Sequence, residues 1–247
     1  MNASETLWHD VENGGYGEDL EIWRALAAGE PGPILDLGCG TGRVALDLAR
    51  RGHAVCAVDR DARLLEALRF RAWERELEID AVEADLPPLD LGERRFGLIL
   101  APMQLLQLLR GSDDRVELMR SVREALVPGG LFAAAIVEGT PSETWEAGQE
   151  APLPDVRERA GWVYSSLPVS VRSENGRIVI ERLRQAVSPA GEMAEESDRV
   201  ELSLLAASTL ETEAAAAGLA AAGRTEIGET DRYASAVVVL LRAKRAD

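Results

Sequence analysis

Residues 34–43 constrain the fold more than any other stretch of the chain. The stretch opens with an apolar run set off by prolines and a glycine, which is typical of a buried strand in a parallel sheet. A turn with three glycines follows, and apolar and charged residues then alternate at helical spacing. Gly38, Gly40 and Gly42 allow positive φ and leave the backbone open to a flat ligand at the helix N-terminus. The stretch predicts a strand, a turn and a helix that together bind a nucleotide-like small molecule.

Two features separate this turn from a dinucleotide-binding fingerprint. That fingerprint has a third small residue two positions after its second glycine, where this chain has the bulky Arg43. An acid, Asp36, lies inside the strand, and Gly42 adds a further glycine. The turn therefore resembles the first motif of the class I S-adenosylmethionine-dependent methyltransferases. The resemblance implies S-adenosylmethionine as the cofactor, held in this motif by Asp36, Gly38, Cys39 and Gly40.

The composition excludes several classes of function. With 43 acidic and 27 basic residues, the chain lacks the basic face that nucleic-acid phosphates require. Its only lysine, Lys244, lies in a charged tail, which leaves none for Schiff-base chemistry. Cys39 and Cys56 have no CxxC spacing, and no residues have the spacing of a metal site. Because the N-terminus is polar and no run reaches membrane-spanning length, we expect a soluble cytoplasmic protein without nucleic-acid or membrane partners.

The next two predicted strands each end in an acid. His53–Asp59 ends about twenty residues after the glycine turn, the distance at which such folds place a carboxylate on ribose hydroxyls. Asp59 would equally serve as the cap of the amphipathic helix predicted over Ala62–Arg75. In the family that the chain resembles, an Asp after the third strand faces the adenine amino group and the next side chain packs on the ring. The matching residues are Asp85 and Leu86, and Arg60 beside Asp59 is assigned to the same cofactor.

The fourth predicted strand, Phe96–Ala101, ends where the cofactor's methyl group would lie. Ligands of open α/β sheets gather at the carboxyl ends of the strands, so we place Ala101 at the cofactor. Family members that methylate adenine or amide nitrogens carry an Asn/Asp-Pro-Pro-aromatic motif here, whereas this chain has Ala101-Pro102-Met103-Gln104. This departure argues against nucleic-acid bases as acceptors.

The rest of the chain predicts the end of the sheet and an insert. A helix from Ser112 to the Pro128-Gly129-Gly130 turn precedes a fifth strand over 131–138. Period-two alternation around Asn175-Gly176 predicts a β-hairpin. A helix with capping-box spacing at Ser208–Glu211 and two last strands follow.

We therefore predict an α/β fold with a doubly wound, Rossmann-like, mostly parallel sheet and an antiparallel β insert. The family resemblance implies seven strands, the last of them antiparallel. The predicted parts are an N-terminal arm and helix at 1–32, an S-adenosylmethionine-binding domain at 33–139 and 207–247, and the insert at 140–206. The insert would be a lid or the face of a homodimer, and both alternatives stay open.

Residues of the N-terminal arm and of the fifth strand are candidates for closing the site or for acid–base chemistry. In related small-molecule methyltransferases an N-terminal tyrosine closes over the cofactor, and Tyr16 resembles it; alternatively, Trp8, Tyr16 and Trp23 only dock the arm on the core. The cofactor's methyl group is already activated, so the protein chiefly has to align donor and acceptor. A hydroxyl acceptor would need a base, for which His9, Tyr16 and Glu138 are weak candidates.

The predicted function is methyl transfer from S-adenosylmethionine to a nitrogen or oxygen atom of a small-molecule acceptor. One alternative is a non-catalytic protein that binds the same cofactor or S-adenosylhomocysteine and associates through the β insert. A nicotinamide-dependent oxidoreductase is disfavoured by Arg43. The acceptor, the methylated atom and the oligomeric state do not follow from the sequence.

Replacing the predicted ribose ligand tests this interpretation. We expect Asp59→Ala to weaken S-adenosylmethionine binding by roughly 1–3 kcal/mol, because hydrogen bonds to a charged group are lost. Isothermal titration of the variant and the wild type measures the difference. Unchanged affinity would remove Asp59 from the site.

Overall fold

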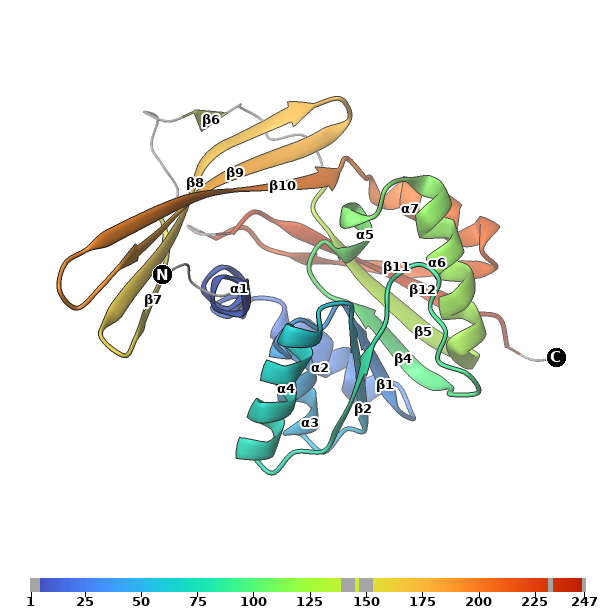
Figure 1. Ribbon diagram of the computed structural model, residues 1–247. Coiled ribbons are helices and arrows are strands. Elements are labelled where there is room, and N and C mark those ends of the chain that lie inside the picture. The colour runs from blue at the N-terminus through green and yellow to red at the C-terminus, as the bar shows by residue number, and fades with distance from the viewer. Residues whose placement is uncertain (1–4, 139–144, 147–152, 231–232, 246–247) are drawn as a thin grey trace. The chain divides into compact units, whose positions relative to one another are not determined.

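The chain folds into two compact units, which are described separately. The computed structural model describes residues 5–138, 145–146, 153–230 and 233–245. The α/β unit comprises residues 17–138, 205–228 and 235–247, and the β unit comprises residues 1–16, 139–204 and 229–234. Figure 1 labels the elements of both units. The predicted division into an arm, a cofactor-binding domain and an insert stays a prediction.

A seven-stranded sheet, sheet A, forms the centre of the α/β unit in the described residues, in the order β11-β12-β5-β4-β1-β2-β3. Its strands are β1 (Ile34–Leu37), β2 (Val55–Asp59), β3 (Ile79–Glu83), β4 (Phe96–Ala101), β5 (Leu126–Ile136), β11 (Leu219–Ile227) and β12 (Ala236–Ala243). The first five pair in parallel, whereas β12 runs antiparallel to both β5 and β11. The predicted doubly wound sheet with an antiparallel last strand is confirmed.

Helices cover both faces of sheet A (Figure 1). One face carries α2 (Leu20–Gly29), α3 (Arg43–Ala49) and α4 (Ala62–Glu74); the other carries α5 (Leu105–Leu108), α6 (Ser112–Ala125) and α7 (Ala207–Ala216). Alternate residues of β1 serve the two cores: Ile34 belongs to the first and Leu35 to the second. A strand buried on both faces has to be apolar, which explains the continuous apolar run that opens the glycine-rich stretch. Asp36 is the polar exception within that strand.

One predicted helix boundary and one predicted helix cap are wrong. The helix from Ser112 ends at Ala125, and Pro128-Gly129-Gly130 lies within β5 instead of ending the helix. No side chain of the predicted capping box caps α7; the carboxylate of Glu138 accepts the N–H of Ala207 at 2.5 Å. Because the capping residue follows a distant strand, the sequence at the start of α7 does not indicate it.

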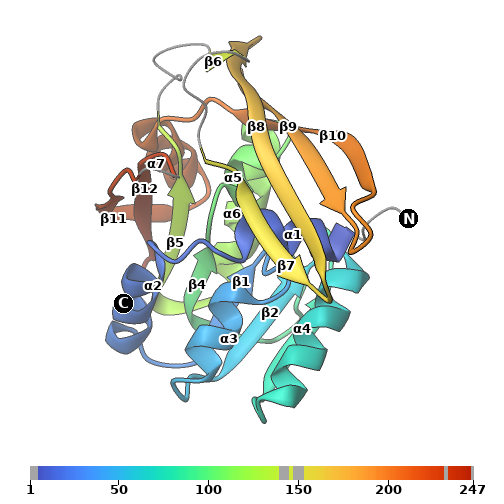
Figure 2. The ribbon, with the colours of Figure 1, turned by 90° about the vertical axis from the view of Figure 1, so that its left-hand side faces the viewer.

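The β unit contains an antiparallel sheet, sheet B, with strand order β10-β9-β8-β6 and β7 paired to β8. Figure 2 shows its long strands side by side; the bounds are β6 (Trp145–Glu146), β7 (Asp155–Arg159), β8 (Trp162–Glu174), β9 (Arg177–Val187) and β10 (Met193–Ser203). The predicted hairpin is confirmed, since Asn175 and Gly176 have φ of 49° and 75°, as a tight turn of this type requires. Ala160 and Gly161 form a second such turn, with φ of 52° and 78°. It escaped prediction because alanine seldom adopts positive φ.

The N-terminal segment is helical, which corrects the predicted irregular arm. Helix α1 (Glu5–Asn13) packs on β7 and β8 and buries Leu7, Trp8 and Val11 at helical spacing. The ring of Trp8 meets the edge of Tyr164 at a centroid distance of 5.8 Å. These apolar contacts fix one side of α1 to sheet B.

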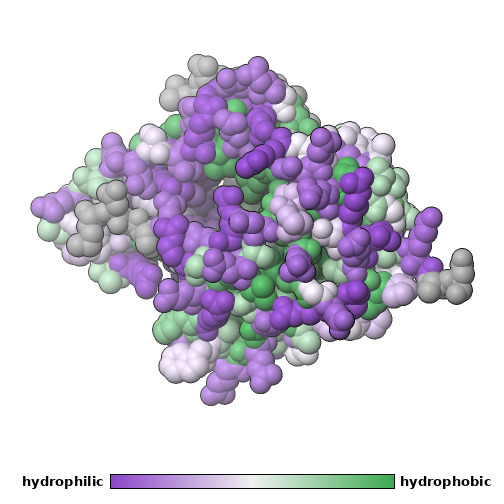
Figure 3. Space-filling view, turned by 45° about the vertical axis from the view of Figure 1, so that its right-hand side comes forward, coloured by the Kyte–Doolittle hydropathy of each residue, from purple (hydrophilic) through white to green (hydrophobic). Residues whose placement is uncertain are grey.

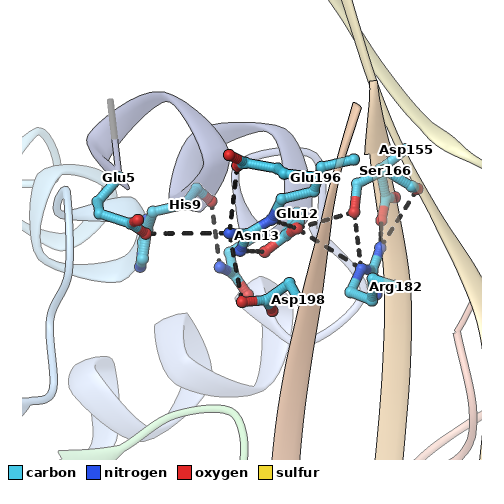
Figure 4. Close-up of polar contacts among 10 residues, drawn as sticks. Glu5, His9, Glu12, Asn13, Asp155, Ser166, Arg182, Glu196 and Asp198 are labelled. Atoms are coloured by element: carbon cyan, nitrogen blue, oxygen red, sulfur yellow. Dashed lines mark hydrogen bonds and ion pairs between the residues drawn. The ribbon is translucent and has the colours of Figure 1, made fainter. Parts of the chain in front are cut away.

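A buried charge cluster also holds α1 on sheet B (Figure 4). Nε and Nη2 of Arg184 donate to the two carboxylate oxygens of Glu12 at 2.7 and 2.9 Å, and the Ser166 hydroxyl donates to Glu12 at 2.8 Å. Burial acts to raise the pKa of Glu12, but the bonds from Arg184 and Ser166 outweigh it, so this pKa lies below its usual value. Glu12 therefore stays ionised against the sheet.

Figure 3 shows one face of the protein. Hydrophilic residues cover most of the face drawn in Figure 3. Among the described helices, none combines the length and the apolar character that crossing a bilayer requires.

A close backbone contact at the start of β4 provides a test of the packing. A Cβ at Gly97 would lie 1.6 Å from the carbonyl oxygen of Pro31, which is backbone and has little freedom to move. We expect Gly97→Ala to lower the free energy of unfolding by about 3 kcal/mol, the upper end of the usual cost of overpacking, measured by denaturant titration. Gly29→Ala is the matched control, because nothing lies within 4 Å of a Cβ there and alanine favours the helix. Equal stability of the two variants would contradict the contact.

Candidate functional site

The candidate site lies at the carboxyl ends of the parallel strands of sheet A. From β1 the chain builds the sheet outward through β2 and β3, then returns to place β4 on the other side of β1. The turn after β1 and the loop after β4 therefore leave the sheet in different directions. In open α/β sheets this reversal creates the crevice in which ligands bind.

The turn after β1 has the geometry that its glycines predict. Gly38, Gly40 and Gly42 have φ of 64°, 55° and 91°, conformations that other residues adopt only with strain. The N–H of Cys39 donates to the carbonyl of Val58 at 3.0 Å, which ties the turn to the end of β2. The Cys39 thiol is buried, and burial raises its pKa, so it stays protonated. A Cβ at Gly38 would lie 2.9 Å from Leu105, so the turn also packs against the segment that follows β4.

The carboxylate of Asp59 lies against this turn. It accepts the N–H of Gly40 at 2.8 Å and the N–H of Asp61 at 3.0 Å. The cap of α4 is Asp61, whose side chain accepts the N–H of Arg63 at 2.8 Å. The cap that the sequence left open for Asp59 therefore belongs to Asp61, and Asp59 faces the turn at the carboxyl end of β2.

The other predicted cofactor residues of the α/β unit surround the same edge of sheet A. The N–H of Ala84 donates to the carbonyl of Asp59 at 3.0 Å, which places the segment after β3 beside the end of β2. In that segment Asp85 is exposed and Leu86 is half-buried against the core. Arg60 is exposed, whereas Ala101 is fully buried at the end of β4. The structure thus brings together the cofactor residues predicted from β1, β2, β3 and β4.

Asp36 is a buried carboxyl group without a hydrogen-bond partner. Its side chain is on the α2–α4 side of β1, the residue is 1% exposed, and neither oxygen meets a donor among the described residues. Burial raises the pKa of Asp36 from 3.8 to about 7, and the positive charge of Arg43 offsets this only in part. A buried carboxyl left without partners costs free energy unless a ligand satisfies it.

The charge nearest to Asp36 is already committed to another acid. Nη2 of Arg43 donates to Asp19 at 2.7 Å, and the indole N–H of Trp23 donates to the same oxygen at 2.7 Å. Asp19 directly precedes α2 and is fully buried. The bulky residue that breaks the dinucleotide fingerprint is therefore used for an ion pair with α2. Nothing in the local sequence marks this pair, because its members are 24 residues apart.

Gln107 is a second buried polar residue that sequence reasoning missed. Its amide donates to the carbonyl of Val137 at 3.1 Å and accepts the N–H of Val137 at 2.8 Å. Glu138 comes directly after this clamp and caps α7. The segments that follow β4 and β5 are thereby fixed to each other.

The three weak candidates for a general base occupy different surroundings. His9 lies in α1, where its carbonyl accepts the side-chain amide of Asn13 at 3.1 Å. Tyr16 is buried in the β unit, with its ring 4.8 Å from that of Tyr233. Glu138 belongs to the α/β unit.

Comparison with known proteins agrees with this geometry. Residues 34–130 match the family described as a methyltransferase domain. The cypemycin N-terminal methyltransferase of a Streptomyces species is 34% identical over 119 residues, which are 48% of this chain and 46% of that protein. The chain thus matches about half the length of such curated relatives.

Solved structures show the same fold over nearly the whole chain. DesVI of Streptomyces venezuelae superposes with a TM-score of 0.73 at 18% identity, covering 100% of both chains. The sugar N-methyltransferase KedS8 of a Streptoalloteichus species gives 0.72 at 20% identity, covering 100% of this chain and 94% of that one. The chain therefore has the Rossmann-like α/β fold of these solved methyltransferase structures.

The pKa of Asp36 gives a stability test in the absence of ligand. The folded protein holds the carboxyl proton of Asp36 more tightly than the unfolded chain does. Protonated Asp36 therefore contributes its full stabilisation of the folded state below about pH 4, and this contribution is lost as the pH rises to about 7. Asp36→Asn stays neutral. We expect the stability of Asp36→Asn relative to wild type, measured as the difference in free energy of unfolding, to be about 2–3 kcal/mol greater at pH 8 than at pH 5.

Asp47→Asn is the control for this experiment. A hydrogen bond from Arg24 holds the pKa of Asp47 below its usual value, so Asp47 is ionised in both states from pH 5 to pH 8. Its replacement should lower stability equally at the two pH values. If Asp36→Asn behaved in the same way, the neutral state of Asp36 would be refuted.

Proposed function

We propose that the protein is an S-adenosylmethionine-dependent methyltransferase that acts on a nitrogen or oxygen atom of a small molecule. The observation that carries the proposal is the buried, unpartnered carboxyl of Asp36 beside the glycine turn. This cofactor bears an ammonium and a sulfonium group, and ionised Asp36 would complement such a cation. A glycine turn that needs only structural support would not require a buried acid without donors.

The residues of the site fit the parts of this cofactor. Asp36 and the turn at Gly38 and Gly40 would hold its amino-acid portion. Asp59 is oriented at the carboxyl end of β2 by the N–H of Gly40, and it would accept the ribose hydroxyl protons. Exposed Asp85 would accept a hydrogen bond from the adenine amino group, and Leu86 would pack on the adenine ring. Cys39, Arg60 and Ala101 would border the same ligand, and Tyr16 would close over it.

The chain's own contribution to catalysis is alignment. When bound, S-adenosylmethionine supplies an activated methyl group. The strand ends and the loop after β4 would hold an acceptor lone pair in line with that group, which can contribute several kcal/mol. The loop is held in one arrangement, since Met103 has φ of 54° and Gln107 clamps Val137. We assign no general base among His9, Tyr16 and Glu138.

An amine is the favoured acceptor. The names of the cypemycin N-terminal methyltransferase and the sugar N-methyltransferase both specify nitrogen. A neutral amine is a sufficient nucleophile without a base, in agreement with the absence of an assigned one. The net charge of −16 favours a small-molecule acceptor over nucleic acid. Two free, buried cysteines are consistent with a cytoplasmic location.

Parallel titrations test the cofactor class. Isothermal titration with S-adenosylmethionine, S-adenosylhomocysteine and NAD should give micromolar binding of the first two and none of NAD. The affinity for S-adenosylmethionine should rise several-fold from pH 6 to pH 7.5, because Asp36, whose pKa is about 7, has to ionise. Asp36→Asn should remove most of this rise. Binding of NAD alone, or of nothing, would overturn the proposal.

A screen of small amines and hydroxyl compounds then tests catalysis. Formation of S-adenosylhomocysteine in the presence of an acceptor supports an enzyme. Tight cofactor binding without turnover across both acceptor classes would favour the alternative of a non-catalytic binding protein.

A further inference from the structure

Two aromatic side chains of α4 lie in solvent. Phe70 is 55% exposed and Trp73 is 74% exposed, and their ring centroids are 6.0 Å apart. The opposite side of the helix supplies Leu65, Leu68 and Ala72 to the core. The fold of the α/β unit is therefore complete without the two aromatic rings. Adjacent exposed rings of this size mark interaction surfaces in soluble proteins.

The two rings belong to a continuous stripe along the helix. Residues three and four positions apart share one side of a helix, and this side of α4 faces away from β2 and β3 (Figure 1). We call it the outer face of α4, consisting of Arg63, Glu66, Ala67, Phe70, Trp73 and Glu74. It combines an apolar centre with charges of both signs.

The composition of the outer face determines which partner suits it. Its flanking charges have both signs and so do not match a uniformly anionic surface such as nucleic acid or acidic lipid. The outer face instead requires a surface with its own apolar centre and its own flanking charges. A second copy of α4 offers both, and twofold symmetry is the commonest arrangement of soluble homo-oligomers.

An antiparallel pair of α4 helices is self-complementary. With the twofold axis between residues 68 and 69, Phe70 of each copy lies opposite Ala67 of the other, so that a large side chain meets a small one. In the same register Arg63 lies opposite Glu74 of the second copy, and symmetry forms this pair twice. Arg63 uses Nε and Nη2 to bond Asp61 but remains 65% exposed. Glu74 has no ion pair with a described residue.

We propose that the outer face of α4 is the interface of a homodimer, with two α4 helices packed antiparallel around Phe70 and Trp73. A helix of 13 residues is about 20 Å long, which buries less area than most permanent interfaces. The dimer is therefore reversible, with a dissociation constant in the micromolar range. It is independent of the proposed catalytic activity, because its readout is mass and not cofactor binding.

Sedimentation equilibrium of the full chain over a concentration series tests the proposal. The wild type should pass from monomer to dimer, and Phe70→Ser with Trp73→Ser should stay monomeric throughout. Leu108→Ser is the matched control, because Leu108 is 54% exposed but lies on α5, outside the outer face. This control should dimerise like the wild type. Unchanged thermal unfolding verifies that each variant is folded.

Charge reversal tests the antiparallel register. Arg63→Glu and Glu74→Arg each place like charges opposite one another twice, and each should weaken the dimer about tenfold. The double variant restores opposite charges at both pairs, and its dimer should have the dissociation constant of the wild type. A monomeric wild type, a dimer that survives loss of both aromatic rings, or a double variant weaker than the single ones would overturn the proposal.

Discussion

The turn between β1 and α3 has no room for side chains at Gly38 and Gly42, and the candidate site depends on this constraint. A Cβ at Gly38 would meet Leu105 at 2.9 Å, and one at Gly42 would meet Leu68 at 2.1 Å. The turn is thus packed between the segment after β4 and the helix α4. Because its backbone is fixed from both sides, the N–H of Gly40 can orient the carboxylate of Asp59. Tight packing and ligand binding require the same residues here, and this explains why a local glycine pattern predicted both.

The buried acids of the α/β unit differ in whether a basic side chain pairs with them, and this difference points to function. Asp19 forms an ion pair with Arg43 and accepts a hydrogen bond from Trp23, and Asp47 accepts hydrogen bonds from both Nε and Nη2 of Arg24. Asp36 receives no such bond. Packing could have neutralised it as it neutralised the others, at a gain in stability. A fold that keeps one acid uncompensated gives up stability at a site where a cationic ligand can restore it.

The two units rely on different interactions. The α/β unit has apolar cores on both faces of sheet A, so its strands are held mainly by burial. In the β unit, by contrast, buried Arg184 and half-buried Arg182 bond acids from α1 and from another strand (Figure 4). Such pairs are directional and leave a strong penalty when one partner is removed. They fix the position of α1 on its sheet more closely than apolar contacts alone would.

The sequence by itself determined the features that depend on near neighbours. Positive φ at the glycines, the apolar run of β1 and the Asn175-Gly176 hairpin all follow from local conformational preferences and periodicity. Because parallel strands end at one edge, the sequence also placed its acids at that edge. Only the tertiary structure decided how the charges pair. Glu12 meets Arg184 across 172 residues, and Glu138 caps a helix 69 residues away. Ion pairs depend on separation in space, which the spacing of residues along the chain does not contain.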